Sequence, residues 1–221
     1  LWLVDTAGQS KPFHVEVAPN TTASVAVSAA GEIAYSWRQS DMNIWRVNLD
    51  KTHKPIDAPK PLVTSTMDEI VPRFSPDGKQ LVFISRRSGS EEVWSSLSDG
   101  TNPVQLTNVG HAGSPSWSPD GTHIVFDSAR EGQYEVYSIL ATGGSARRLT
   151  NHPEVDGVAS YSKDGQFIYF MSRRSGSEQV WRMRADGSEP AQLTKGGGYL
   201  ARESADGKHL APAFRLRHAD P

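Results

Sequence analysis

The chain has 221 residues and a net charge of −2 at neutral pH, so no excess of charge draws it to nucleic acid or to an anionic membrane. It contains no cysteine, which excludes disulfides and thiol chemistry and leaves the compartment open. No apolar run approaches the ~18 residues of a membrane-spanning helix. We therefore expect no direct nucleic-acid binding and no membrane insertion by this chain.

The predicted elements are short strands from the N-terminus onward. The stretch "LWLVDTAGQSKPF" predicts a pair of strands, so residues 1–20 form a half repeat. Residues 24–66 predict a unit of four strands, in which the insertion "KTHKPIDAPK" lengthens the loop between the third and fourth strands. A half unit is thus followed by a complete one.

Residues 69–109 show the unit most clearly. "VPRFS" predicts a first strand, "PDG" a turn, and the alternating "KQLVFIS" a second strand. The polar "RRSGSE" predicts a hairpin loop, which is followed by the strands "EVWSSLS" and "PVQLT" with a "DG" turn between them. Because glycine and proline interrupt every stretch long enough for a helix, this unit is predicted to be entirely β.

The same unit recurs over residues 112–151 and 156–195, and its first two strands recur over 199–216. The "DG" turns return about every 43 residues, and the heptad "SRRSGSE" occurs twice because it belongs to alternate copies. Four short strands per ~43 residues is typical of a propeller blade. We predict an all-β propeller of four-stranded antiparallel blades, four complete and two half, in a single domain or domain fragment over residues 1–221.

Two features of the predicted ring follow from this unit. Stacked blades bury their faces against one another, and aromatic residues are predicted to fill the spaces: Phe74, Trp117, Tyr161, Trp45, Trp94, Tyr137 and Trp181. The two half blades complete a five-blade ring within one chain, or the array belongs to a larger ring whose unpaired edges join a second copy as a homodimer. The four arginines of the two heptads are predicted to lie in solvated turns with glutamates nearby, and a binding patch is the alternative.

The motifs "PRFSPDGKQLVFISRRSGSEEVW", "PSWSPDGTHIVFDSAREGQYEVY" and "ASYSKDGQFIYFMSRRSGSEQVW" resemble the WD40-like (PD40) repeat of the TolB type over almost the whole chain. The blade order most resembles the C-terminal propellers of bacterial CadC-like winged-helix regulators. The resemblance implies a bacterial β-propeller, periplasmic or cytoplasmic, that binds proteins or ligands. Related repeats also occur in the propellers of prolyl-oligopeptidase-like peptidases, so the resemblance does not decide whether this chain is an enzyme.

Candidate site residues lie in the loops that join the fourth strand of one blade to the first strand of the next. In a closed ring, the side chains of these loops are expected to converge on the axis. Carboxylates suit calcium and histidines suit zinc, which gives a candidate metal set: Asp68, Glu69, His111, Glu154 and Asp156. Three further residues are ligand-binding candidates: His152, Tyr199 and Glu203. The alternative is that these groups cap backbone N–H groups and tie loops together.

The sequence favours a binding scaffold, with a protein or small-molecule ligand at the channel rim, over two other functions. One is a calcium- or zinc-dependent hydrolase of esters or phosphotriesters in the channel, and the other is the sensor domain of a winged-helix regulator. No GxSxG, P-loop, HExxH or CxxC motif is present. We therefore assign no catalytic residue and no certain cofactor from the sequence.

Overall fold

The computed structural model describes residues 2–3, 13–14, 22–27, 33–37, 42–204 and 209–213. The chain divides into two compact units, Leu1–Ser40 and Asp41–Pro221, and each is described by itself. All the regular elements in the described ranges are β-strands, which confirms the predicted fold class. Within these ranges, the chain has no helix that is long and apolar enough to cross a membrane.

The first unit consists of two antiparallel strand pairs. β1 (Trp2–Leu3) pairs with β2 (Phe13–His14), and β3 (Thr22–Val27) pairs with β4 (Ile33–Trp37). The first pair corresponds to the half blade predicted over residues 1–20. The second supplies the first two strands of the blade predicted over residues 24–66, whose last two strands lie in the other unit. The union of these four strands in one sheet stays a prediction, as does the five-blade count.

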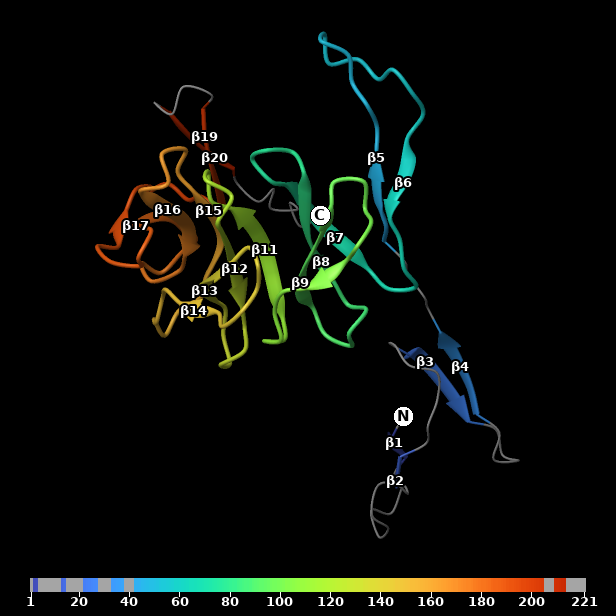
Figure 1. Ribbon diagram of the computed structural model, residues 1–221. Coiled ribbons are helices and arrows are strands. Elements are labelled where there is room, and N and C mark those ends of the chain that lie inside the picture. Colours follow the sequence, from blue (N-terminus) through green and yellow to red (C-terminus); the bar gives the residue numbers. More distant parts are fainter. Residues whose placement is uncertain are drawn as a thin grey trace. The chain divides into compact units, whose positions relative to one another are not determined.

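The second unit begins with a hairpin and continues with three four-stranded antiparallel sheets, which Figure 1 shows as successive blades. The hairpin is β5 (Ile44–Arg46) and β6 (Lys60–Val63). The first blade contains β7 (Glu69–Phe74), β8 (Gln80–Ser85), β9 (Glu92–Leu97) and β10 (Val104–Gln105). The second contains β11 (Ala112–Trp117), β12 (His123–Ser128), β13 (Glu135–Leu140) and β14 (Arg147–Arg148). The third contains β15 (Asp156–Tyr161), β16 (Phe167–Ser172), β17 (Gln179–Arg184) and β18 (Ala191–Gln192).

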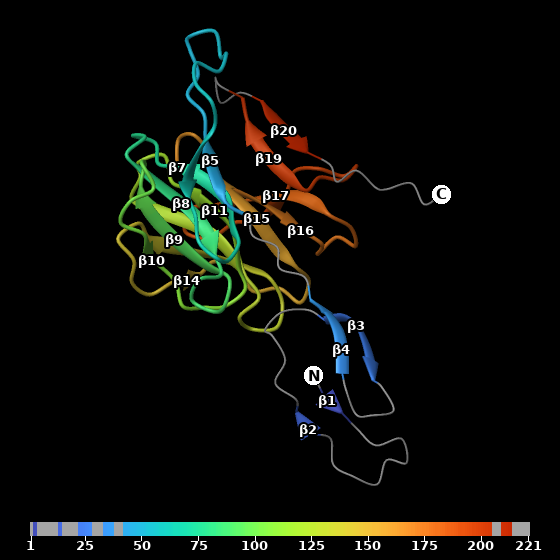
Figure 2. The ribbon, with the colours of Figure 1, turned by 90° about the vertical axis from the view of Figure 1, so that its right-hand side faces the viewer.

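A last strand pair follows the third blade, formed by β19 (Leu200–Glu203) and β20 (Leu210–Ala213). The first strands of consecutive blades are neighbours, because β11 contacts both β7 and β15, and β15 contacts β19. Figure 2 shows the same succession from the side, with β7, β11 and β15 in order. The ends of these first strands therefore meet in one region of the unit.

In the three complete blades, the "DG" turn between the first and second strands is closed by a serine two residues before the aspartate. In the first blade, the Ser75 hydroxyl donates to Asp77 Oδ1 at 2.6 Å and accepts the Gln80 backbone N–H at 2.9 Å, while Gly78 takes a φ of 70°. Positive φ is easily reached by glycine, which explains its place in the turn. The second and third blades repeat the contact with Ser118–Asp120 and Ser162–Asp164. The turns predicted between first and second strands are confirmed.

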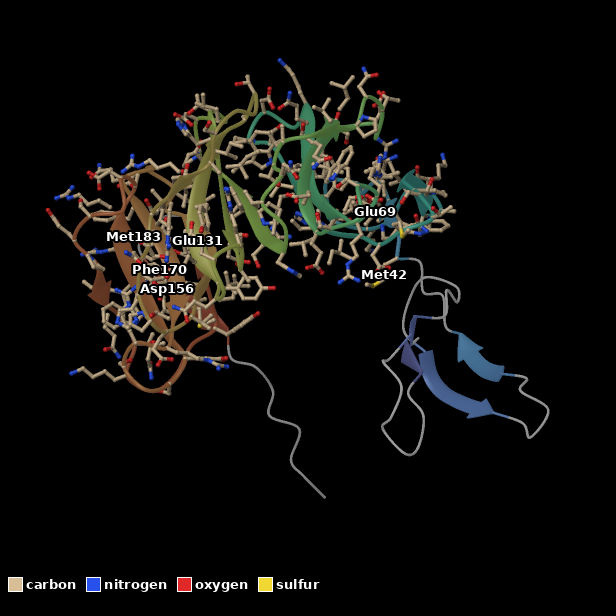
Figure 3. All side chains as sticks on the ribbon, turned by 90° about the horizontal axis from the view of Figure 1, so that it is seen from below. Met42, Glu69, Glu131, Asp156, Phe170 and Met183 are labelled. Carbon is tan, nitrogen blue, oxygen red and sulfur yellow. The ribbon has the colours of Figure 1, made fainter. Side chains whose placement is uncertain are left out.

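The core lies between blades, because alternate residues of each second strand face opposite neighbours. In β12, Ile124 and Phe126 pack in the cluster shared with the first blade, and Val125 packs against Ile168 and Phe170 of the third. Figure 3 labels Phe170 and Met183, two fully buried members of this second cluster. Burial of such side chains contributes roughly 1.5–3 kcal/mol each, so the interfaces stabilise the blades jointly.

The prediction that aromatic residues fill the spaces between blades is confirmed for Trp117 and Tyr137, which are buried. Trp117 reaches back to the preceding blade, where its indole N–H donates to the Arg73 carbonyl at 3.1 Å. Phe74 and Trp45 are 53% and 59% exposed, and for these two residues it stays a prediction. Phe74 occupies the position of Trp117, but the repeat before it is divided between the two compact units.

Candidate functional site

Each first strand begins with a bulge at which the backbone leaves the regular ladder. The register shifts within β7, β11 and β15, and a residue with positive φ lies in each shift: Val71 at 55°, Ser114 at 46° and Val158 at 53°. A β-branched residue in this conformation is strained by about 1–2 kcal/mol, so neighbouring contacts must hold it. At Val158 one such contact is plain, because its backbone N–H donates to Asp127 Oδ2 at 2.7 Å.

Asp127 is a carboxylate at a position where the other blades carry apolar residues. It pairs across the sheet with Gly113, whereas the equivalent pairs are Ile70 with Ile84 and Gly157 with Met171. The Asp127 side chain is almost completely buried, since the residue is only 5% exposed. A buried carboxylate is costly unless it is hydrogen-bonded or paired with a cation, so its surroundings decide what it does.

Two glycines make room for this carboxylate. A Cβ added to Gly113 would lie 2.4 Å from Asp127 Oδ1, and one added to Gly157 would lie 3.2 Å from Oδ2. Gly113 belongs to the blade of Asp127, and Gly157 belongs to the next blade. The side chain is therefore held in a slot between the two blades, where the Ser114 hydroxyl and the Val158 N–H donate hydrogen bonds to it.

Burial raises the pKa of Asp127 to about 6, although the hydrogen bonds from Val158 and Ser114 act in the opposite direction. Among the residues that the structure describes, no lysine, arginine or histidine forms an ion pair with it. At neutral pH the slot thus holds a negative charge that hydrogen bonds stabilise and that no cation of the described ranges balances.

Asp127 lines a cavity of about 380 Å³ at the beginning of the three first strands. This volume lies within the range of small-molecule sites, about 300–1,000 Å³. The walls come from all three blades and from the segment that leads into β19: Ile70, Val71, Ile84, Glu91, Ala112, Gly113, Ser114, Asp127, Tyr134, Val155, Gly157, Val158, Met171, Arg173, Glu178 and Tyr199. Most of the wall is apolar, and its charged groups are few.

Those other charged groups balance one another. Glu91 pairs with Arg86 at 2.5 Å, and Glu178 pairs with Arg173 at 2.8 Å. Tyr134 is 38% exposed, and burial together with the charges of Glu91 and Asp127 raises the pKa of its hydroxyl. The cavity therefore combines an apolar wall, tyrosine side chains and one carboxylate that has no counter-ion among the residues described.

Two of the predicted metal ligands, Glu69 and Asp156, occupy equivalent positions, but each bonds to an arginine of its own blade. Glu69 is 2.9 Å from Arg87, and Asp156 contacts Arg174. Burial raises the pKa of Asp156, and its contacts with Ser172 and Arg174 oppose this shift. Figure 3 labels both acids and shows them well apart.

The heptad arginines divide into two kinds. Arg87 and Arg174 are largely buried, and each stacks with its guanidinium carbon 4.9 Å from the ring centroid of a tryptophan, Trp94 or Trp181. Arg86 and Arg173 are about half exposed and pair with glutamates at the end of the same turn. The predicted solvated turn with glutamates nearby is therefore found for the first arginine of each heptad, and the second arginine is part of the blade.

The remaining candidates lie in different surroundings. Asp68 accepts the Met42 backbone N–H at 3.1 Å, and His111 is exposed, 3.9 Å from Glu91. The Nδ1 atom of His152 accepts a hydrogen bond from the Glu154 backbone N–H, and the backbone N–H of His152 donates to Glu135 Oε1.

Glu203 accepts hydrogen bonds from the Tyr169 hydroxyl at 2.6 Å and the Lys163 backbone N–H at 2.8 Å. Tyr199 lines the Asp127 cavity, from which Glu203 is absent. In the described part of the chain, no three histidine, aspartate or glutamate residues gather closely enough to hold a metal ion. The metal set stays a prediction that this arrangement does not bring together.

Asp127 is not among the predicted site residues, because it lies within the strand sequence "HIVFDS" and is compatible there with an ordinary strand residue. A signal was present in the repeat itself. Aligned on the "DG" turns, Asp127 replaces Ile84 and Met171, and Gly113 replaces Ile70. A charge that interrupts an apolar column, opposite a glycine, marks a departure from what packing alone requires.

A second cavity of about 460 Å³ lies beside the "DG" turns of the second and third blades. Its acids, Asp120 and Asp164, each accept a serine hydroxyl and a backbone N–H of their own turn. These bonds hold the pKa of both carboxyls below the usual value, that of Asp120 at about 2. The acids of this cavity are thus committed to turn structure, unlike Asp127.

A family model described as TolB beta propeller domain matches residues 57–217. Among solved structures, the putative TolB of Agrobacterium tumefaciens is 25% identical over 90% of this chain and 72% of that chain, with a TM-score of 0.67. TolB of Acinetobacter baumannii is 26% identical over 76% of this chain and 42% of that chain, with a TM-score of 0.64. An oligogalacturonate lyase in complex with manganese, 16% identical over 86% of this chain and 57% of that chain with a TM-score of 0.61, shares the fold alone. The comparison with curated proteins gave no match.

Proposed function

The chain belongs to the TolB β-propeller domain family, and on that premise we propose that it is a binding scaffold whose recognition site is the cavity around Asp127. A propeller supplies a rigid frame, and the function of such a frame lies in the residues placed on it. Here three blades contribute side chains to one cavity, so the frame fixes the shape that a small ligand or a partner's side chain must match.

The observation that carries this proposal is the Gly113–Asp127 pair. The neighbouring blades show that apolar side chains pack well at the equivalent positions of Asp127, so stability does not require a carboxylate. Burying one costs free energy, and the two glycines that accommodate it remove side-chain packing as well. Departures from local packing rules are expected where a protein binds something.

The test is a fragment screen on the full chain, followed by two-dimensional amide NMR, with acids, amines and neutral compounds in the collection. The proposal predicts that binding fragments shift the amides of Gly113, Ser114 and Val158. The amides of the opposite turns, such as Gly78 and Gly121, serve as the internal control. Shifts confined to those turns, or no fragment that reaches the cavity, would overturn the proposal.

A pair of exposed side chains gives the matched variants. Tyr134→Ala removes a ring from the cavity wall and is expected to weaken fragment binding several-fold. Leu140→Ala removes a side chain that is 51% exposed and does not line the cavity, and it should leave the affinity unchanged. Equal affinities of the two variants would contradict the placement of the site.

Two other functions predicted from the sequence have less support. For a metal-dependent hydrolase, Glu69 and Asp156 would have to exchange their arginine partners for an ion. For the sensor domain of a CadC-like regulator, the support is the resemblance of blade order alone. The scaffold role requires no exchange of these ion pairs, and the family membership is consistent with it.

A further inference from the structure

The charge of the cavity restricts what it can take. Glu91 and Glu178 each have an arginine partner, so Asp127 contributes the negative charge that remains. An anionic ligand would bring a second negative charge against this buried carboxylate, and a low-dielectric setting makes such repulsion strong. A cation, by contrast, would supply the counter-ion that the described part of the chain does not give Asp127.

The wall of the cavity restricts the ligand further. Ile70, Ile84 and Met171 line the same cavity as Asp127, and a fully hydrated inorganic ion would gain nothing from these apolar side chains. An alkyl stem packs against such side chains. Tyr134 and Tyr199 also line the cavity, and aromatic rings attract organic cations.

We infer that the pocket binds a protonated primary amine carried on an apolar stem, with its ammonium group against the Asp127 carboxylate. A primary ammonium has three donors, and a hydrogen bond between an ammonium and a carboxylate is among the strongest in proteins. Either a free alkylamine or the lysine side chain of a partner protein has this chemistry. The inference rests on the proposed function, since it names the ligand class of the same cavity.

The affinity for such a cation depends on pH. Asp127 must be ionised, so binding weakens as the pH falls through about 6. The other titratable groups that line the cavity are Glu91, Tyr134, Arg173, Glu178 and Tyr199. His111 lies 3.9 Å from Glu91 outside the cavity, and the variant His111→Asn controls for its imidazole group.

The test uses butylammonium as the probe, with butan-1-ol as its neutral isostere and butyrate as its anionic one. Amide NMR titrations of the full chain at pH 7.5 should show butylammonium bound in the cavity, at least tenfold more tightly than either isostere. In Asp127→Asn, which keeps the side-chain shape, the affinity for butylammonium should fall at least tenfold. Glu189→Gln removes one charge from an exposed residue outside the cavity, and it should change the affinity less than threefold.

A second measurement does not depend on the folding of any Asp127 variant. The wild-type chain and His111→Asn should both lose most of their affinity for butylammonium between pH 7.5 and pH 5. Nα-acetyl-lysine methylamide, titrated in parallel, separates the two sources. Tighter binding of this compound supports a protein lysine as the ligand, and tighter binding of butylammonium supports a free amine.

The outcomes separate this inference from the proposed function. If butyrate or butan-1-ol binds in the cavity as tightly as butylammonium, the amine class is wrong and the binding site stands. If the affinity for butylammonium is the same at both pH values, Asp127 is not the partner of the ammonium. If neither these probes nor any fragment reaches the cavity, the proposed function fails as well.

Discussion

At the scale of single residues, the ionisation of Asp127 should make the folded chain less stable as the pH rises. The folded-state pKa of about 6 lies above the ordinary value of 3.8, so between these values the folded state holds a proton that the unfolded state has lost. The free energy of unfolding therefore falls as the pH rises through this window and recovers as the pH is lowered.

Asp127→Asn removes this dependence. The free energy of unfolding of Asp127→Asn minus that of wild type should be about 2 kcal/mol larger at pH 7.5 than at pH 4.5, because each pKa unit corresponds to about 1.4 kcal/mol. The variant thus gains stability relative to wild type as the pH rises. Urea unfolding of both chains at the two pH values measures this difference. If the free energies of unfolding of the two chains differ by the same amount at both pH values, the pKa of Asp127 is not raised by burial in the folded state.

The ion pair of Glu69 with Arg87 makes a second prediction at this scale. Arg87→Met keeps the apolar stem but leaves the buried Glu69 without its cation, and this should cost about 3 kcal/mol. Glu69→Ala should cost less, because Arg87 is 20% exposed and can turn its charge toward water. The next blade carries Ala112 at this position.

Denaturant unfolding measures the loss of stability in Arg87→Met and in Glu69→Ala and shows which is larger. Arg130→Met is the matched control in the second blade, where the equivalent arginine is exposed, and it should change stability by less than about 0.5 kcal/mol. A larger loss in Glu69→Ala than in Arg87→Met would contradict the structural role of the buried acid.

At the scale of elements, the bulged first strands and the second strands beside them are coupled through Asp127. Gly113→Ala would place a Cβ 2.4 Å from Asp127 Oδ1, so the carboxylate must move and its bond from Val158 must weaken. We expect a loss of about 1–3 kcal/mol in the wild-type background. In the background of Asp127→Ala the same substitution should cost much less, because the clash is removed.

A double-mutant cycle with these variants measures the coupling between the two strands. The structure predicts a coupling free energy above about 1 kcal/mol. Additive losses would mean that Asp127 does not occupy the slot between Gly113 and Gly157. The pairing of Ile70 with Ile84 in the first blade shows how the site packs without either feature.

The strands themselves were predictable because local signals agree with one another. Apolar alternation located β8, β12 and β16, and the serine–aspartate–glycine turns located their starts. The partners of the acids were not predictable in the same way. Glu69 and Arg87 are far apart in sequence, and only the pairing of β7 with β8 shows that the arginine returns to the first residue of its own blade.

At the scale of the whole molecule, neighbouring blades share their cores and should lose structure together. Phe126 is completely buried in the cluster between the first and second blades, so Phe126→Ala should cost about 3–5 kcal/mol. Amide hydrogen exchange should then show reduced protection in β8 of the first blade as well as in β12. Loss confined to the second blade would contradict a shared core.

The sequence predicted the repeating unit but not the cavity, because the cavity belongs to no single repeat. Its walls come from three blades, and its charge comes from one residue that departs from the repeat, Asp127. Repeat analysis detects the residues that all copies have in common, whereas this site depends on residues that differ between the copies. The repeated turns with Asp77, Asp120 and Asp164 were prominent in the sequence for the opposite reason, since each copy of the unit contains one.

The proposed binding site depends on a carboxylate that is buried in the cavity between the blades without a counter-ion among the described residues. Its most direct test is a titration of the side-chain carboxyl carbons by ¹³C NMR, with Asp127→Asn used to assign the Asp127 signal. The account predicts that this signal titrates near pH 6, well above the ordinary aspartate value of 3.8. A midpoint at or below 3.8 would mean that Asp127 is solvated or paired with a cation, and it would remove the basis of the proposed binding site.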